Sequence, residues 1–156
     1  MADRCILSID PGLSGAFAIY YPDAPERVFA EDMPVVDGEV DPHPLASRIA
    51  LYGPALAVVE RVGPMPRDGI KQAFRFGSAY SVARTVVALA HVPTTLVTPQ
   101  TWKKRFNLRG GDEGKEAARA LAIRLFPASA DRFARKLDHG RAEAALLAKY
   151  AAEKLA

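Results

Sequence analysis

The chain has 156 residues, of which 49% are hydrophobic and 25% charged, and this fits one ordinary globular domain covering residues 1–156. A chain of this length buries most of its apolar surface in one core without disulfide staples. Its single cysteine, Cys5, excludes an internal disulfide and lies in an apolar run, as expected for a buried thiol in a reducing compartment. We find no signal-peptide pattern and no apolar stretch of membrane-spanning length, so we expect a cytoplasmic protein with no membrane partner.

The formal net charge of +3 is unevenly distributed along the chain. Residues 1–100 carry 8 basic and 11 acidic side chains, whereas residues 101–156 carry 13 basic and 7 acidic ones. A basic C-terminal third suits a polyanionic partner such as nucleic acid. A solvated helix surface would give the same asymmetry, so charge alone does not decide between them.

Three short strands are predicted at the start of the chain. An apolar run over residues 5–10 ends at Asp10 and leads into a turn over residues 11–15, which contains Pro-Gly and Ser-Gly pairs. Residues 16–21 pair back on the first strand, and residues 27–33 close an antiparallel meander. Asp10 is therefore expected to be held rigidly at an edge of the sheet.

A second strong signal is the apolar run over residues 55–60, typical of a strand buried on both faces, which ends at Glu60. It is preceded by a predicted loop over 37–44 and a helix over 44–52. The remaining pattern predicts a loop over 63–69, a helix over 70–91, a strand over 94–98, a helical turn over 100–106, a loop over 109–114, helices over 115–126 and 141–155, and an irregular or short helical segment over 131–139.

This order of elements predicts an α/β fold with a mixed five-stranded sheet and helices on its faces. A meander followed by βα units places the first strand at the centre of the sheet, with strand 55–60 parallel beside it. Asp10 and Glu60 then end neighbouring strands at one edge, where open α/β sheets form ligand and metal sites.

The last predicted helix adds another carboxylate. Glu143 lies at the head of an apolar stripe that contains Leu146 and Tyr150. A carboxylate is expensive to bury unpaired, so Glu143 either pairs with a cation such as Arg141 or ligates a metal. Asp138 and His139 lie at the entrance of the same helix, and an N-cap role would also explain an aspartate there.

Carboxylates gathered from strand and helix ends suit hard divalent cations, and we expect Mg²⁺ or Mn²⁺. Two such ions about 4 Å apart stabilise both the attacking and the leaving oxygen of a phosphodiester displacement. The ions also reverse the local charge, which makes an acidic cluster compatible with a polyanionic substrate.

Four blocks of the sequence resemble the RuvC-type Holliday-junction resolvases, which have the ribonuclease H-like fold. They occur in the family's order and span almost the whole chain. The blocks are IDPGLSG at 9–15, VE at 59–60, TPQTWKK at 98–104 and DHGRAEAALL at 138–147. The wording around residues 138–144 is similar to that of phage and prophage members.

The resemblance implies a metal-dependent endonuclease, usually a homodimer, that nicks two opposed strands of a four-way DNA junction. Asp10, Glu60 and Glu143 correspond to the first, second and last family acids. The family's third acid lies a few residues before the last one, and the spacing here departs from that pattern. We rank Asp138 first and His139 second for this position.

The resemblance also implies roles for residues that contact DNA. Lys115 matches a family basic position near the scissile phosphate, and the helix over 70–91 is expected to form the dimer surface. Residues assigned to phosphate contact are Lys103, Lys104, Arg105 and Arg109. Met65, Phe74 and Phe76 are candidates for insertion at the junction centre, with core packing as the alternative for the two phenylalanines.

Two other functions fit the same residues. One is a related nuclease that acts on other branched DNA or on an RNA–DNA hybrid. The other is a junction-binding protein without catalysis, in which Glu143 is ion-paired. A sugar-kinase-like ATPase is disfavoured because 156 residues are too few for two lobes.

Overall fold

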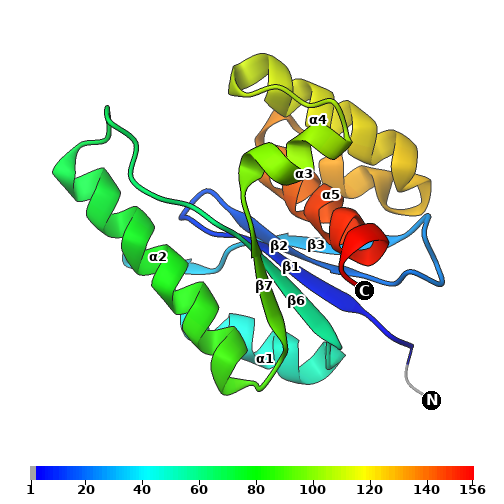
Figure 1. The fold of residues 1–156 in the computed structure, drawn as a ribbon, viewed down its shortest axis with the longest axis horizontal. Coiled ribbons are helices and arrows are strands. Elements are labelled where there is room, and N and C mark those ends of the chain that lie inside the picture. The colour runs from blue at the N-terminus through cyan, green and yellow to red at the C-terminus, as the bar shows by residue number, and fades with distance from the viewer. Residues whose placement is uncertain (1–2) are drawn as a thin grey trace.

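A five-stranded sheet forms the centre of the molecule in the computed structural model, which describes residues 3–156; the first two residues of the predicted domain lie outside the described residues (Figure 1). The strand order across the sheet is β3-β2-β1-β6-β7. These strands are β1 (Ile6–Asp10), β2 (Ala16–Tyr20), β3 (Val28–Asp32), β6 (Leu56–Glu60) and β7 (Thr94–Val97).

The sheet is mixed, as predicted. The strands β1, β2 and β3 form an antiparallel meander, whereas β6 runs parallel to both β1 and β7. The register pairs Ile9 with Val59 and Glu60 with Val97. Asp10 and Glu60 therefore end adjacent parallel strands at the same edge, with the first strand at the centre of the sheet.

Helices cover both faces of the sheet, which confirms the predicted architecture (Figure 1). One face packs against α1 (Pro42–Tyr52) and α2 (Ile70–Leu89). The other packs against α3 (Pro99–Arg105), α4 (Gly111–Leu125), the 3-10 helix η1 (Pro127–Phe133) and α5 (His139–Lys154). A second 3-10 helix, η2 (Lys136–Asp138), contacts α4, η1 and α5. No helix within residues 3–156 is long and apolar enough to cross a membrane.

The helix α5 lies directly on β1 and β2 because its buried face is built mainly from small residues. The Ser8 hydroxyl of β1 donates a buried hydrogen bond to the carbonyl of Ala144. At the start of α5, a Cβ added to Gly140 would lie 2.9 Å from the carbonyl oxygen of Ser14, so only glycine permits this approach. This contact holds the first turn of α5 against the turn that follows Asp10.

The segment predicted as a loop over residues 37–44 contains the turn and second strand of a small hairpin, formed by β4 (Val35–Val36) and β5 (Glu39–Val40), and the start of α1 at Pro42. Asp37 and Gly38 connect these strands with φ angles of 52° and 78°, the left-handed pair that a tight hairpin turn requires. Strands of two residues have no period from which they could be recognised in advance.

The predicted loop over residues 109–114 is also partly wrong, because α4 already begins at Gly111. Asp112 and Glu113 lie in its first turn, where negative charge interacts favourably with the helix dipole. A Cβ added to Gly114 would lie 1.8 Å from the carbonyl oxygen of Arg109. The glycine therefore serves close packing of the chain and does not mark flexibility.

Candidate metal and nucleic-acid site

Three carboxylates from separate elements meet at the carboxyl edge of β1 and β6. They belong to Asp10 at the end of β1, Glu60 at the end of β6 and Glu143 one turn into α5. Burial raises the pKa of Asp10 well above its usual range, and the charges of Glu60 and Glu143 and a hydrogen bond with Glu143 raise it further. The three predicted acids therefore interact with one another.

The turn after Asp10 is tight, and Asp10 and the turn residues line a cleft. The Gly15 N–H donates to the Gly12 carbonyl at 3.2 Å, and a Cβ added to Gly15 would lie 2.0 Å from the Asp10 carbonyl oxygen. Gly12 has a φ of 126°, and a Cβ there would lie 3.2 Å from the ring of Phe76. Glycine is thus required at both positions, and Phe76 packs over the turn instead of facing solvent.

Glu60 is buried and is held by Trp102 of α3. The indole Nε1–H donates to Glu60 Oε2 at 2.7 Å, and the Trp102 side chain is fully buried. Burial raises the pKa of Glu60, the hydrogen bond from Trp102 lowers it, and the charge of Glu143 raises it. Trp102 lies in one of the blocks identified from the sequence, but its hydrogen bond to Glu60 was not predicted.

Lys103 faces the carboxylates. Its Nζ lies 3.1 Å from Glu143 Oε1 and 5.5 Å from the centre of the Trp102 ring. Arg141, the cation considered for Glu143 from the sequence, instead pairs with Asp32 at 2.9 Å. Lys103 was predicted to contact phosphates, but here it partly neutralises the acidic cluster.

The donor atoms at this edge suit a hard divalent cation, since all three acids offer carboxylate oxygen. Within residues 3–156, however, no group of three or more His, Cys, Asp or Glu side chains has the spacing of a formed metal site. Glu60 is bound to Trp102, and Glu143 is bound to Lys103. The carboxylate oxygens of these residues are therefore of the type that binds a hard divalent cation. In this structure the positive charge beside Glu143 is supplied by Lys103.

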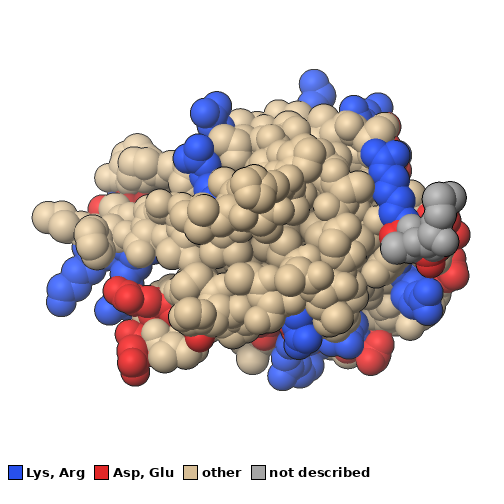
Figure 2. Space-filling model, turned by 90° about the horizontal axis from the view of Figure 1, so that it is seen from below, with Lys and Arg blue, Asp and Glu red and all other residues tan. Residues whose placement is uncertain are grey.

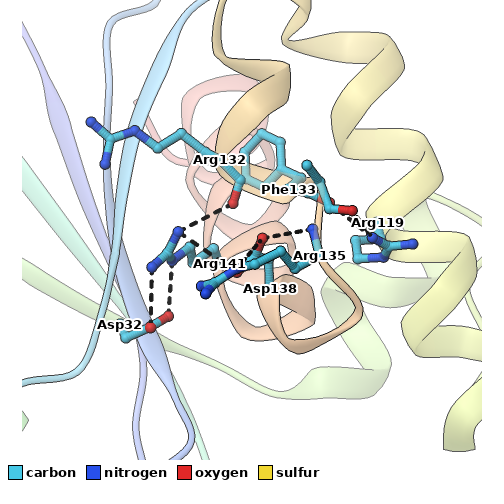
Figure 3. A network of polar contacts seen from close by, with 8 residues as sticks. Asp32, Arg119, Arg132, Phe133, Arg135, Asp138 and Arg141 are labelled. Carbon is cyan, nitrogen blue, oxygen red and sulfur yellow. Dashed lines mark hydrogen bonds and ion pairs between the residues drawn. The ribbon is translucent and has the colours of Figure 1, made fainter.

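The structure does not bring Asp138 to this cluster. Its buried carboxylate accepts from the backbone N–H and the guanidinium of Arg135, both at 2.8 Å, and lies 3.6 Å from Nη1 of Arg141 (Figure 3). Burial opposes ionisation, but the hydrogen bonds and charges of the two arginines outweigh it, and the pKa of Asp138 is lowered. This placement argues against ranking Asp138 before His139 as the further ligand.

His139 faces the site instead. It lines a cleft of about 550 Å³ together with Asp10, and it lies one helical turn before Glu143, on the same side of α5. Its Nδ1 is buried and has no hydrogen-bond partner among the described residues. His139 is therefore the residue at the entrance of α5 whose placement suits a metal ligand.

The same cleft reveals two basic residues that sequence reasoning missed. Lys71 and Arg75, in the first two turns of α2, line it opposite the turn after Asp10. Their spacing of four residues places them on one side of the helix, and this periodicity was a signal that could have identified them. They bring positive charge to the mouth of the acidic site.

The remaining predicted DNA contacts lie outside the cluster. Lys104 and Arg109 are exposed, Arg105 pairs with Glu153 at 2.9 Å, and Lys115 lies 3.8 Å from Asp112 on its own helix. The predicted insertion residues Met65 and Phe74 have exposed fractions of 67% and 76%. Their roles stay predictions.

Solved structures share this fold. A Thermus thermophilus RuvC structure in complex with Holliday junction substrate aligns over 96% of this chain and 96% of its own, with a TM-score of 0.66 and 15% sequence identity. A second Thermus thermophilus RuvC structure aligns over 96% of both chains, with a TM-score of 0.60 and 16% identity. No protein-family model and no curated protein matches the sequence. The predicted α/β fold with a mixed five-stranded sheet is thus confirmed, and these RuvC structures share it.

The ion pairs of Asp138 lead to a stability prediction. Replacing Asp138 by Asn leaves Arg135 and Arg141 without their shared carboxylate, and we expect a lower free energy of unfolding at pH 7, with the loss reduced by the solvent exposure of Arg135. Because the folded pKa of Asp138 lies below the unfolded value of about 3.9, its contribution is present above that pH and is lost as the pH falls through the folded pKa. Asp138→Asn should therefore flatten the acid-induced loss of stability.

Urea unfolding at pH 7 and at steps down to pH 3 measures both effects. Asp131→Asn, an exposed aspartate in η1, is the matched control and should unfold like the wild type. Equal stability of Asp138→Asn and the wild type at pH 7 would contradict the structural role.

Proposed function

We propose that this protein is a metal-dependent nuclease that cuts branched DNA, with four-way junctions resolved by paired nicks as its main reaction. The observation that carries the proposal is the meeting of Asp10, Glu60 and Glu143 at one sheet edge, beside an open cleft with a basic margin. The likeness of the fold to a RuvC structure bound to a Holliday junction substrate supports this choice of substrate.

Asp10, Glu60, Glu143 and His139 would hold two Mg²⁺ or Mn²⁺ ions. When bound, such ions supply an activated water and stabilise the leaving oxygen of the phosphodiester. Because burial and then the charges of Glu60 and Glu143 raise the pKa of Asp10, cation binding favours its charged form and is coupled to proton release. Lys103 would exchange its place beside Glu143 for contact with the negatively charged substrate.

The DNA would approach between α2 and the β1–β2 turn. Lys71 and Arg75 offer charge at the cleft, and the exposed side chains of Met65 and Phe74 lie before and within the first turns of α2, where an apolar wedge could separate base pairs. The phosphates farther away would be contacted by the predicted residues Lys104, Arg105, Arg109 and Lys115.

A homodimer formed through α2 would suit a junction with two equivalent cleavage points. Ile70, Gly77 and Ser81 are exposed and spaced at seven and four residues, so they form an uncharged stripe along one side of α2. Figure 2 shows the neighbouring lower face of the molecule, where Lys, Arg, Asp and Glu gather mainly at the margin.

One observation favours a second function. The ion pair between Lys103 and Glu143 is the arrangement expected of a junction-binding protein without catalysis. Such a protein would bind junctions equally well without divalent cations and would yield no product with any of them. Mg²⁺ and Mn²⁺ titrations of binding and cleavage therefore separate the two functions.

The nuclease assignment predicts that Asp10→Asn abolishes cleavage while junction binding survives, because the change removes a metal-binding charge and keeps the shape of the turn. The assay compares cleavage of a four-way junction, a fork, a flap and an RNA–DNA hybrid, with binding measured in parallel. Asp23→Asn, in the β2–β3 connection, is the control and should cut normally. Normal nicking by Asp10→Asn would contradict the nuclease assignment.

The proposed phosphate contacts predict a change in salt dependence. Lys104→Ala should weaken binding to all branched substrates alike and reduce the slope of log affinity against log salt by about 1, since one counterion fewer is released. Lys154→Ala, at the opposite end of α5 from the site, should leave the slope unchanged. Identical slopes for the wild type and Lys104→Ala would remove Lys104 from the DNA path.

The proposed dimer predicts that Ser81→Arg yields a monomer, because it introduces an unpaired charge and a long side chain into the uncharged stripe. Sedimentation velocity at several concentrations measures the effect. Ser47→Arg, an equally exposed serine on α1, should remain a dimer. A wild-type protein that sediments as a monomer throughout would refute the dimer.

A further inference from the structure

We infer that Trp102 is a positioning residue, whose indole N–H fixes the carboxylate of Glu60 for cation binding. The inference rests on the proposed function in one respect, that Glu60 helps to hold the metal. It extends the site beyond its charged groups, to a neutral donor on the short helix α3.

The sheet register determines where Trp102 lies. Glu60 is paired with Val97 of β7, and the N–H of Arg61 donates to the Val97 carbonyl at 2.7 Å. Thr98 then caps α3, with its hydroxyl accepting from the N–H of Thr101, and Pro99 provides the first helical residue. One turn of helix is enough to bring Trp102 back to the strand end where Glu60 lies.

The contact itself leaves little freedom to either partner. The Nε1 to Oε2 distance is 2.7 Å, the indole is fully buried, and Phe106 packs against it with ring centres 6.4 Å apart. An indole N–H is a donor only, so the hydrogen bond has one possible direction and holds one oxygen of Glu60. The second oxygen is left for another partner.

The neutral indole of Trp102 and the charged ammonium group of Lys103 have different effects on metal binding. Lys103 neutralises Glu143 and competes with a metal for the same carboxylate. Trp102 carries no charge and therefore orients Glu60 without competing electrostatically with the ion. Hydrogen bonds of this kind to metal ligands are worth about 10- to 100-fold in metal affinity.

Trp102 is the only tryptophan in the chain, so its indole N–H gives one NMR signal that needs no assignment. In the wild type, titration with Mg²⁺ alone should shift this signal saturably. In Glu60→Gln the signal should start at a different position and respond weakly. A wild-type indole signal that does not respond to Mg²⁺ would overturn the inference, and this measurement does not require a Trp102 variant to fold.

The second measurement uses Trp102→Phe, which keeps an aromatic ring in the core and removes the N–H. The half-saturating Mg²⁺ concentration, obtained as the Kd that fits the rise in unfolding temperature with Mg²⁺, should increase about 10-fold. Cleavage at saturating Mg²⁺ should return to within a few-fold of the wild-type rate, because the ligands themselves remain. Phe106→Leu, which alters packing against the same indole without touching Glu60, should unfold at lower temperature and keep the wild-type half-saturation.

The outcomes separate this inference from the proposed function. A wild-type half-saturation in Trp102→Phe, in a protein that cleaves junctions, overturns the positioning role alone. A Mg²⁺-responsive indole in a protein that cleaves no branched DNA supports the positioning role and overturns the proposed nuclease. A Phe106→Leu variant with the same loss of Mg²⁺ affinity as Trp102→Phe shows general packing and overturns the positioning role.

Discussion

The carboxylates of Asp10, Glu60 and Glu143 cannot all be charged at one partly buried sheet edge without a compensating positive charge. Lys103 supplies such a charge by pairing with Glu143, whereas burial and then the charges of Glu60 and Glu143 raise the pKa of Asp10. A divalent cation bound by the three carboxylates would neutralise more of their negative charge than Lys103 does. Placing three acids together costs electrostatic free energy, and perturbed pKa values of this kind cluster at functional sites. This cost is the physical reason for regarding the site as a candidate functional site.

The fold was largely predictable because its strongest signals are local. Two apolar runs that each end on an acid identified β1 and β6, and the meander pattern placed β1 at the centre of the sheet. The two misjudged loops lacked such signals. The β4–β5 hairpin is too short for periodicity, and the glycines at 111 and 114 resemble a flexible loop although Gly114 packs closely against the Arg109 carbonyl in the first turn of α4.

The candidate site was also only partly predictable from the sequence. Asp10, Glu60 and Glu143 were identified from strand ends and a helical stripe. The choice between Asp138 and His139 depended on where α5 begins and on Arg135, which pairs with Asp138 at i,i+3 because a short 3-10 helix precedes α5. The pairing of Lys103 with Glu143 and of Trp102 with Glu60 likewise depends on the orientation of α3, which the sheet register determines.

The packing of α5 on the sheet determines when the last of the three acids reaches the other two. Ser8 and Ala144 are joined by a hydrogen bond across 136 positions of sequence, and Asp10 and Glu143 meet beside it. Contacts of such long range form late, because the loop they close is long. In a chain synthesised from its N-terminus, the sheet would be present before the last acid could reach it. We therefore expect an incompletely made chain to lack the acidic site.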